Sequence, residues 1–500
     1  MWLGKKTILA DFMNNMLWKR SGLVLGPMAF LLIVLFFRPE GLSQEALAVM
    51  ALAIWMAIWW ISEAIPISAT ALLPLLVLPL TGALPMDDTA APYADPKVLL
   101  YMGGFMIAVT IEKWNLHKRI ALSIISLIGT DMRFIVLGFM LATALLSMWI
   151  SNTATSLMML PIAVAVVNQL AEGITQNEVT DTMIGQALML GIAYSASIGG
   201  MATIIGTPTN IVLVGIVKEL YGIEIGFAEW MLVGLPISLC LLGICWWYLV
   251  RVAYPFPKNM TLAGGKAEIQ RQLTALGTIS KPEVRVLIVF LLVSFCWISR
   301  VFLLQDLLPF LNDTIIALAG VIALFMIPAA RGKKRLLDWK TAENIPWGIL
   351  LLFGGGLSLA AGFKVTGLAA WLGGHFEALQ GIHFLVFILI IVASVNFLTE
   401  ITSNVATASM LLPILGAVAL ALGVHPYGLM VAATMAASCA FMLPVATPPN
   451  AVVFGSGYLT IPAMAKAGLW MNILSIFFIT LFVYYIMPLL WGIDLKVYPF

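Results

Sequence analysis

Apolar runs long enough to cross a membrane recur along the whole of this 500-residue chain. Each spans roughly 17 to 25 residues, the length at which a helix crosses a hydrocarbon core of about 30 Å. Hydrophobic residues make up 62% of the sequence and charged residues only 10%, so the chain cannot cover itself with a surface that water would solvate. The alternating ten-residue pattern of a membrane β-barrel is absent. The sequence therefore predicts an all-α polytopic membrane protein embedded in the lipid bilayer.

The charges and cysteines argue against several other classes of protein. The formal net charge is +2 and the basic residues are dispersed at the ends of apolar runs, so we expect no nucleic-acid partner. All four cysteines lie within apolar runs and lack zinc-like spacing, which argues against a disulfide or metal framework. The expected partners are therefore lipid and small solutes. No cleavage site follows the basic N-terminal segment, so we expect the first span to be a start-anchor helix.

Two nearly identical polar pentapeptides interrupt the apolar sequence. Ser151-Asn152-Thr153-Ala154-Thr155 recurs 252 residues later as Ser403-Asn404-Val405-Ala406-Thr407. A proline follows each at the same distance, as Pro161 and Pro413. An internal duplication therefore covers most of the chain.

Each pentapeptide lies within a segment that we expect to form a re-entrant hairpin. Residues 133–171 and 382–422 are each long enough for two spans, yet we expect each half to be too short to cross before the polar break. Non-helical backbone at membrane depth is allowed only where protein or a cavity surrounds it. The hairpin tips are therefore expected to lie inside the protein.

A broken helix is expected after each hairpin, over about 183–217 and 427–457. The first is interrupted by Gly206-Thr207-Pro208-Thr209-Asn210 and the second by Ala446-Thr447-Pro448-Pro449-Asn450. Glycine-rich or small-residue sequence that ends in proline unwinds a helix and restarts it, with proline in the first turn of the second piece.

The pattern divides the chain into four parts: an N-terminal segment with the first span over 1–45, repeat 1 over 46–250, a polar cytoplasmic connector over 251–283, and repeat 2 over 284–500. With both hairpins treated as non-crossing, about eleven crossings remain, and five separate equivalent points of the repeats. Because five is odd, the repeats have opposite orientations. Inverted repeats with hairpins and broken helices are typical of secondary transporters.

Basic residues predict the orientation of the chain. With eleven crossings, the basic segments fall on one side of the membrane and the acidic 81–97 loop falls on the other. The basic segments are the N-terminus with Lys5, Lys6, Lys19 and Arg20, residues 113–133, the connector with Arg251, Lys258, Lys266, Arg271 and Lys281, and residues 331–335. The excess of positive charge on cytoplasmic loops places the N-terminus in the cytoplasm and the C-terminus outside.

The polar groups at the predicted tips and breaks are hydroxyls and amides rather than charges. Unwound carbonyls and Ser, Thr and Asn oxygens suit a hard cation such as sodium, while helix N-termini and amide donors suit a carboxylate. A single Ser-Asn-Thr in a membrane helix is explained by interhelical hydrogen bonding, but two copies, each followed by a Thr-Pro-x-Asn break, favour a shared anion and cation site. For the carboxylates Glu63 and Glu400, a proton relay and a capping role both stay open.

The motifs resemble those of the divalent anion:sodium symporter family, whose members import di- and tricarboxylates. The resemblance covers nearly the whole chain and is carried by Trp60-Ile61-Ser62-Glu63-Ala64-Ile65-Pro66, Ile111-Glu112-Lys113-Trp114-Asn115-Leu116-His117, Ser147-Met148-Trp149-Ile150-Ser151-Asn152-Thr153 and the two Thr-Pro-x-Asn breaks. It implies a homodimer whose scaffold domain holds the dimer interface, while the hairpins and broken helices form a transport domain that moves like an elevator.

The resemblance also implies the site residues. It assigns one sodium ion to Ser147, Ser151, Asn152 and Gly200, and a second to Thr399, Ser403, Asn404 and Ala446. Substrate carboxylates would meet Asn152, Thr153, Asn404, Val405 and the Thr447-Pro448 break. Val405 departs from the threonine that some family members carry there, which removes a hydroxyl, so we expect specificity to be set at this position.

The sequence thus predicts sodium-coupled uptake of a C4-dicarboxylate such as succinate, malate or fumarate, with sodium co-transported, across the plasma membrane, expected to be a bacterial inner membrane. Sodium-independent dicarboxylate exchange and symport of a tricarboxylate or sulfate stay open as alternatives. An ion channel would not explain two inverted pairs of hairpin and broken helix. An enzyme is not expected, because it would need a metal cluster or an acid–base constellation that the sequence lacks.

Overall fold

The computed structural model describes residues 2–128, 131–173, 178–256, 263–329, 334–375 and 383–500. Within these ranges the regular structure is helical, apart from one isolated β-bridge between Pro328 and Arg335. Nine of the described helical stretches are long and apolar enough to cross a membrane by length and composition. The predicted all-α membrane fold class is therefore confirmed.

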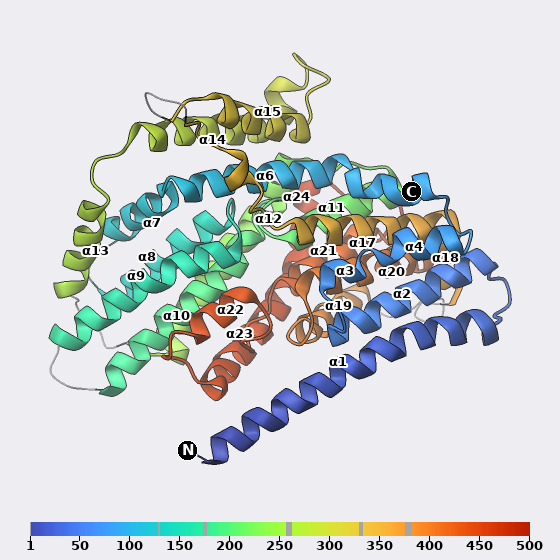
Figure 1. Ribbon diagram of the computed structural model, residues 1–500, viewed down its shortest axis with the longest axis horizontal. Coiled ribbons are helices and arrows are strands. Elements are labelled where there is room, and N and C mark those ends of the chain that lie inside the picture. Colours follow the sequence, from blue (N-terminus) through green and yellow to red (C-terminus); the bar gives the residue numbers. More distant parts are fainter. Residues whose placement is uncertain (1, 129–130, 174–177, 257–262, 330–333, 376–382) are drawn as a thin grey trace.

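The first half of the chain forms the helices drawn in blue and green in Figure 1, followed by one helix in the connector. Their bounds are α1 (Trp2–Phe36), α2 (Gln44–Ser62), α3 (Ile67–Thr70), α4 (Leu73–Leu80), α5 (Met86–Ala90), α6 (Pro96–Lys113), α7 (Leu116–Leu127), α8 (Met132–Ser147), α9 (Asn152–Gly173), α10 (Glu178–Gly200), α11 (Pro208–Tyr221), α12 (Phe227–Tyr248) and α13 (Ala263–Ala275).

The second half repeats much of this order. Its helices are α14 (Lys281–Ser299), α15 (Asp313–Met326), α16 (Trp339–Ala342), α17 (Trp347–Val365), α18 (Leu368–His375), α19 (Phe384–Leu398), α20 (Asn404–Leu422), α21 (Pro426–Ala437), α22 (Pro448–Phe454), α23 (Ile461–Leu481) and α24 (Met487–Trp491). The two predicted broken helices, over about 183–217 and 427–457, are the interrupted pairs α10 with α11 and α21 with α22.

The two predicted hairpins are α8 with α9 and α19 with α20. Their first limbs are short, with 16 and 15 residues, and their second limbs have 22 and 19 residues. The expectation that both halves are too short to cross was wrong for the second limbs by length, and α20 is itself among the nine long apolar helices. The limbs are unequal because the chain unwinds over residues 148–151 and 399–403, which shortens only the first limb of each hairpin.

Each hairpin packs around the broken helix that follows it. Helix α10 lies against α8 and α9, and α21 lies against α19 and α20. The halves also contact each other, because α22 packs against α9 and α10 while α11 packs against α20 and α21. In Figure 1 this interlocked region lies between α7 and α13 at one end of the molecule and α2, α4 and α18 at the other.

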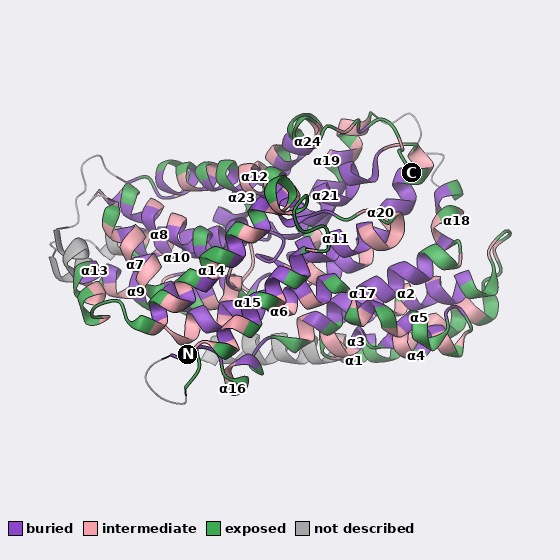
Figure 2. Cartoon of the chain, turned by 90° about the horizontal axis from the view of Figure 1, so that it is seen from above, coloured by how far each residue is buried: buried purple, intermediate pink, exposed green. Residues whose placement is uncertain are grey.

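Burial increases from the periphery toward the interlocked region. The apolar window of α10 is 89% buried, whereas the window of α1 is 11% buried. Figure 2 shows the same gradient, with buried residues along the inner helices and exposed residues on the outer ones. The elements that carry the polar tips and breaks are therefore surrounded by protein.

Two surface segments contain more regular structure than expected. The acidic 81–97 segment, predicted as a loop, contains α5 and a 3-10 turn over Ala91–Ala94. Asp87 and Asp88 lie in the first turn of α5, where negative charge favours a helix. The polar connector contains α13, which packs against α7 and α9.

Part of the basis for the predicted orientation lies outside the described residues, namely Lys258, Arg331 and Lys333. The side chains of Lys5, Lys6 and Lys266 are likewise outside the description. The sidedness of the two termini therefore stays a prediction.

Candidate functional site

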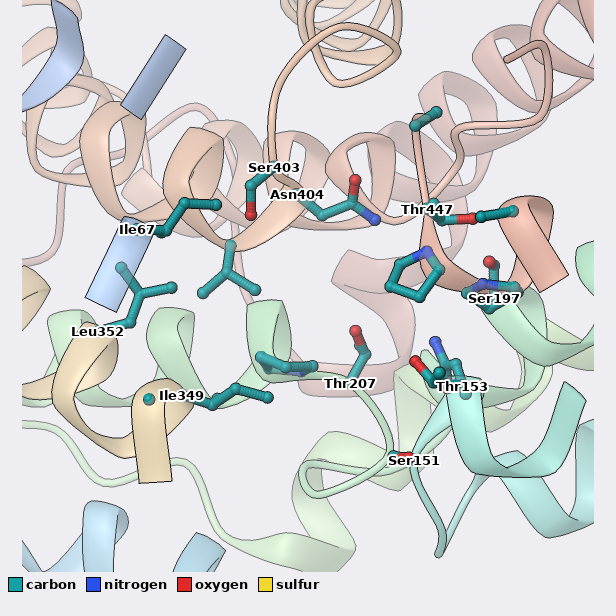
Figure 3. A pocket seen from close by; sticks show the side chains of 18 of the residues that line it. Ile67, Ser151, Thr153, Ser197, Thr207, Ile349, Leu352, Ser403, Asn404 and Thr447 are labelled. Carbon is teal, nitrogen blue, oxygen red and sulfur yellow. The ribbon is translucent and has the colours of Figure 1, made fainter. Parts of the chain in front are cut away.

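Both hairpin tips and both helix breaks line one cavity of about 550 Å³. Its polar lining comes from four segments far apart in the sequence: Ser151, Asn152 and Thr153; Gly206, Thr207 and Pro208; Ser403 and Asn404; and Ala446, Thr447 and Pro448. In Figure 3, Ser403, Asn404 and Thr447 lie on one side of the cavity, and Thr207, Thr153 and Ser151 lie on the other. The duplicated polar sequences thus converge on a single site.

Four helices begin at this cavity. α9 begins at Asn152, α20 at Asn404, α11 at Pro208 and α22 at Pro448. The first N–H groups of a helix have no partner within the helix, and the aligned peptide dipoles give this end a partial positive charge. Proline suits the first turn because its missing N–H would be unpaired there anyway. The arrangement therefore favours an anionic ligand.

Behind the first hairpin tip, oxygen atoms from three segments surround the Asn152 amide. Ser147 Oγ lies 2.5 Å from the nearer terminal atom of this amide, and Ser147 Oγ donates to Ala196 O at 2.7 Å. With its nitrogen facing these groups, Asn152 donates to Ala196 O and Gly206 O, both at 3.2 Å. With its oxygen facing them, the amide completes a cluster of acceptors, which is the chemistry that a sodium ion requires.

Gly200 lies directly beside this cluster. A Cβ at this position would lie 2.8 Å from Asn152 Oδ1 and 3.0 Å from Gly206 O. Real Cβ atoms essentially never come within 3.0 Å of another atom, so only glycine leaves Asn152 in its present place.

The second tip repeats the hydroxyl–amide pair. Thr399 Oγ1 lies 2.6 Å from Asn404 Oδ1 and 3.1 Å from Ala437 O. Thr399 and Asn404 are the positions equivalent to Ser147 and Asn152 under the 252-residue shift. Ser147, Gly200 and Thr399 lie behind the tips, since none of them lines the cavity, whereas Ser151, Asn152, Ser403, Asn404 and Ala446 do.

The asparagine that ends each Thr-Pro-x-Asn motif holds the unwound backbone. Asn210 Nδ2 donates to the carbonyl oxygens of Gly200, Met201 and Thr203, at 3.3, 3.1 and 2.8 Å. Asn450 Nδ2 donates to the carbonyls ten and seven residues before it, Ala440 O at 3.1 Å and Leu443 O at 3.0 Å. The motif predicted the break, but only the folded chain reveals what this asparagine does.

The asparagine bonds also fix the register between the two breaks. Asn210 contacts Gly200 ten residues back, as Asn450 contacts Ala440, so Gly200 corresponds to Ala440 and Gly206 to Ala446. The predicted sodium ligands Gly200 and Ala446 therefore occupy different positions in their repeats. A single shift of 252 residues cannot show this, because the loop between hairpin and break is shorter in the second half.

Several lining residues were not anticipated. The polar ones include Ser68, Tyr101 and Ser197, and the apolar ones include Ile67, Ile349, Leu352, Ile401 and Val445. Their sequence surroundings are ordinary apolar runs, so only the packing of distant helices brings them to the cavity. Glu63 also lines it and pairs with Lys19 at 3.1 Å, with both side chains largely exposed. Val405 lines the cavity as well.

Comparison with known proteins now decides the family. Residues 16–492 match the family described as the sodium:sulfate symporter transmembrane region. The chain belongs to this family. The match agrees with the resemblance to divalent anion:sodium symporters and spans both hairpins and both broken helices.

Relatives of high identity carry transporter names. The chain is 47% identical over 480 residues to the sodium-dependent dicarboxylate transporter SdcS of Staphylococcus saprophyticus, covering 95% of this chain and 92% of that protein. It is 46% identical over 482 residues to the protein of the same name from Staphylococcus aureus strain USA300, with the same coverage.

Two solved transporter structures share the fold at low identity. MtrF of Neisseria gonorrhoeae, from a class of antimetabolite efflux pumps, is 11% identical with a TM-score of 0.53, covering 95% of each chain. The YdaH transporter of Alcanivorax borkumensis is 15% identical with a TM-score of 0.56, covering 83% of this chain and 90% of that one. At these identities the likeness concerns the fold alone.

Proposed function

We propose that this chain is a secondary transporter that imports C4-dicarboxylates, such as succinate, malate or fumarate, together with sodium. The observation that carries the proposal is the meeting of two hydroxyl–amide pairs and four helix starts at one cavity. The names of the relatives at 46–47% identity support both the sodium dependence and the dicarboxylate substrate.

The sodium ions would bind behind the tips. One would take Ser147, Ser151, Asn152 and the Gly200 region as its ligands, and the other would take Thr399, Ser403, Asn404 and the Ala446 region. Each set offers hydroxyl, amide and unwound carbonyl oxygens, and none contains a basic side chain that would repel the cation. Sodium here is cargo rather than a resident cofactor.

The dicarboxylate would lie in the cavity in front of the tips. Its carboxylates would be held by Asn152, Thr153, Asn404 and the first turns of α11 and α22 at Pro208 and Thr447-Pro448. A cavity of about 550 Å³ falls within the range of about 300–1,000 Å³ typical of small-molecule sites. The geometry explains how an anion can bind without a buried lysine or arginine, which would be costly in the membrane.

The apolar part of the lining favours a substrate with a carbon backbone over sulfate. Ile67, Ile349, Leu352 and Ile401 face the same cavity as the polar tips, and Val405 contributes another apolar surface. Methylene groups gain free energy by burial against such side chains, while a tetrahedral oxyanion gains nothing from them. Symport of sulfate is therefore the less favoured alternative.

Coupling would arise because the two asparagines serve both ligands. A cation that binds the amide oxygen of Asn152 or Asn404 leaves the amide nitrogen free to face the carboxylate. The cation also offsets the negative charge of the substrate, so each ligand raises the affinity for the other. The hairpins and broken helices would move together as an elevator-type transport domain within a homodimer in the plasma membrane, with the N-terminus cytoplasmic and the C-terminus outside.

Uptake of labelled succinate into proteoliposomes tests the proposal. An inward sodium gradient should drive accumulation, and potassium in place of sodium should not. Equal uptake without sodium would contradict symport, and uptake that requires internal dicarboxylate would instead establish exchange. Competition by citrate and by sulfate against labelled succinate separates the three substrate classes.

A further inference from the structure

A buried carboxylate distinguishes the second hairpin tip from the first. Glu400 follows Thr399 directly and precedes Ser403 and Asn404, yet it does not line the cavity. Its residue is only 3% exposed. A charged group at such a place persists only when it is well satisfied, so its partners indicate its role.

The carboxylate accepts hydrogen bonds from three consecutive backbone amides of the second break. The Glu400 oxygens lie 2.7 Å from Phe441 N, 3.0 and 3.1 Å from Met442 N, and 3.1 Å from Leu443 N. Asn472 Nδ2 on α23 donates a further bond at 2.7 Å. Glu400 therefore ties the tip of the second hairpin to the unwound backbone and to α23.

The charge of Glu400 is satisfied by dipoles and not by a counter-ion. The ion pairs found within the described part of the chain do not include Glu400. Amide dipoles stabilise the carboxylate but leave its full negative charge at the tip. A sodium ion at Thr399, Ser403 and Asn404 would be the nearest opposite charge along this hairpin.

The first half of the molecule has no such charge. Met148 is equivalent to Glu400 under the 252-residue shift, and its tip is held by a neutral bond from Thr203 Oγ1 to Met148 O at 2.5 Å. Because Asn210 bonds Thr203 O as Asn450 bonds Leu443 O, the break residue equivalent to Thr203 is Leu443. The leucine side chain cannot donate such a hydrogen bond.

The helix behind each break differs in the same way. Gly234 on α12 faces Met201 O and Ala202 O, and Gly468 on α23 faces Phe441 and Met442, so these glycines are equivalent. Four residues later stand Ser238, which donates to Ile198 O at 2.7 Å, and Asn472, which donates to Glu400. The first half thus has the uncharged residues Met148 and Ser238 where the second half has the charged Glu400 and its hydrogen-bond donor Asn472.

We infer that Glu400 is a positioning residue for the second sodium ion: it holds the unwound segment in place and supplies a fixed negative charge that the first sodium position lacks. This inference rests on the proposed symport. It predicts that the two cation positions are energetically unequal, with the tighter one in the second half.

The test uses the full-length protein in proteoliposomes. Glu400→Gln keeps the shape of the side chain, removes the charge and turns an amide NH2 toward backbone N–H groups. We expect it to raise the sodium concentration for half-maximal uptake roughly five- to tenfold, which is within the range of couplings between two sites. The succinate KM at saturating sodium should change by less than about twofold, and Glu400→Asp, which keeps the charge, should restore part of the sodium affinity.

Matched variants and a binding readout separate positioning from a merely structural role. Met148→Leu and Ser238→Ala change the equivalent positions of the first half and should leave the sodium half-saturation unchanged. In the purified protein, the rise in Tm on adding sodium should be smaller for Glu400→Gln than for the parent chain.

A folded Glu400→Gln variant with unaltered sodium half-saturation, or one that loses only maximal rate, would overturn the inference. If this variant does not fold, Asn472→Ser takes its place with a smaller shift in the same direction, and its lack of any shift overturns the inference equally. Sodium-independent uptake by the parent chain would instead refute the proposed symport itself, so the two failures are distinguishable.

Discussion

Asn152 and Asn404 each begin a helix, line the cavity and lie within hydrogen-bonding distance of a hydroxyl behind the tip. No other pair of equivalent residues among those described combines these three positions. The sequence predicted both residues because a polar island in an apolar chain is conspicuous, and more so when it is duplicated. It did not reveal the hydrogen-bonding roles of Asn210, Asn450 or Glu400, because their partners come together only in the folded chain.

Replacement of either tip asparagine should abolish transport without unfolding the protein. We expect Asn152→Ala and Asn404→Ala each to reduce sodium-driven succinate uptake by at least about tenfold, since each removes a group used by both ligands. The measurement is initial uptake in proteoliposomes with equal amounts of protein. Asn344→Ala is the matched control, because Asn344 makes one exposed bond to Lys340 O. Near-normal uptake by both tip variants would show that the site lies elsewhere.

Gly200 offers a steric test of the first sodium position. An alanine Cβ there would lie 2.8 Å from Asn152 Oδ1, so Gly200→Ala should displace the amide and raise the sodium requirement for uptake at least about threefold. Gly243→Ala is the control, because a Cβ at Gly243 meets nothing within 4 Å. The measurement is the sodium concentration for half-maximal uptake in both variants. An unchanged value for Gly200→Ala would argue against this cation position.

Val405 tests substrate preference. Val405→Thr restores the hydroxyl that the first tip has at Thr153, and a donor at the cavity should favour substrates with an additional oxygen. We expect uptake of malate relative to succinate to rise by up to about tenfold, the value of one good hydrogen bond. Competition assays with both substrates measure this ratio. An unchanged ratio would place specificity at other lining residues.

At the scale of elements, the sequence predicted where the hairpins and broken helices occur better than it predicted the lengths of their helices. Proline and the small residues before it located both breaks, because these residues unwind a helix whatever surrounds them. The lengths of α9 and α20 relative to α8 and α19 were not foreseen, because the chain unwinds before each tip and the second limb begins directly at the tip asparagine. The offset between Gly200 and Ala446 was hidden because it depends on how Asn210 and Asn450 reach back across each break.

The break asparagines give a prediction about stability. Asn210→Ala removes three hydrogen bonds to buried carbonyls, and Asn450→Ala removes two. An amide NH2 has two N–H groups, so at about 0.5–1.5 kcal/mol per bond we expect Asn210→Ala to destabilise the protein by about 1–3 kcal/mol, and Asn450→Ala, which leaves one carbonyl fewer without this partner, by somewhat less. Thermal unfolding in detergent should rank them in this order. Equal Tm values for both variants and the parent chain would mean that the breaks hold their shape without these bonds.

At the scale of the whole molecule, two interlocked halves share one cavity but differ in charge behind their tips. The duplication was visible in the sequence as two polar pentapeptides 252 residues apart. The difference in charge was not visible, because it depends on contacts that form only in the folded chain. Thr203 donates to the Met148 carbonyl in the first half, and the amides of Phe441 to Leu443 donate to the Glu400 carboxylate in the second. The two proposed cation positions around one proposed anion site predict a transport cycle that needs more than one sodium ion.

The most direct test of this account is the sodium dependence of initial succinate uptake at fixed membrane potential. Two cation positions coupled through one cavity predict a sigmoidal curve with a Hill coefficient above 1 and no greater than about 2. Potassium at equal ionic strength should support no such uptake. A hyperbolic curve in sodium, or uptake that ignores sodium altogether, would contradict the claim that both hairpin tips bind the co-transported ion.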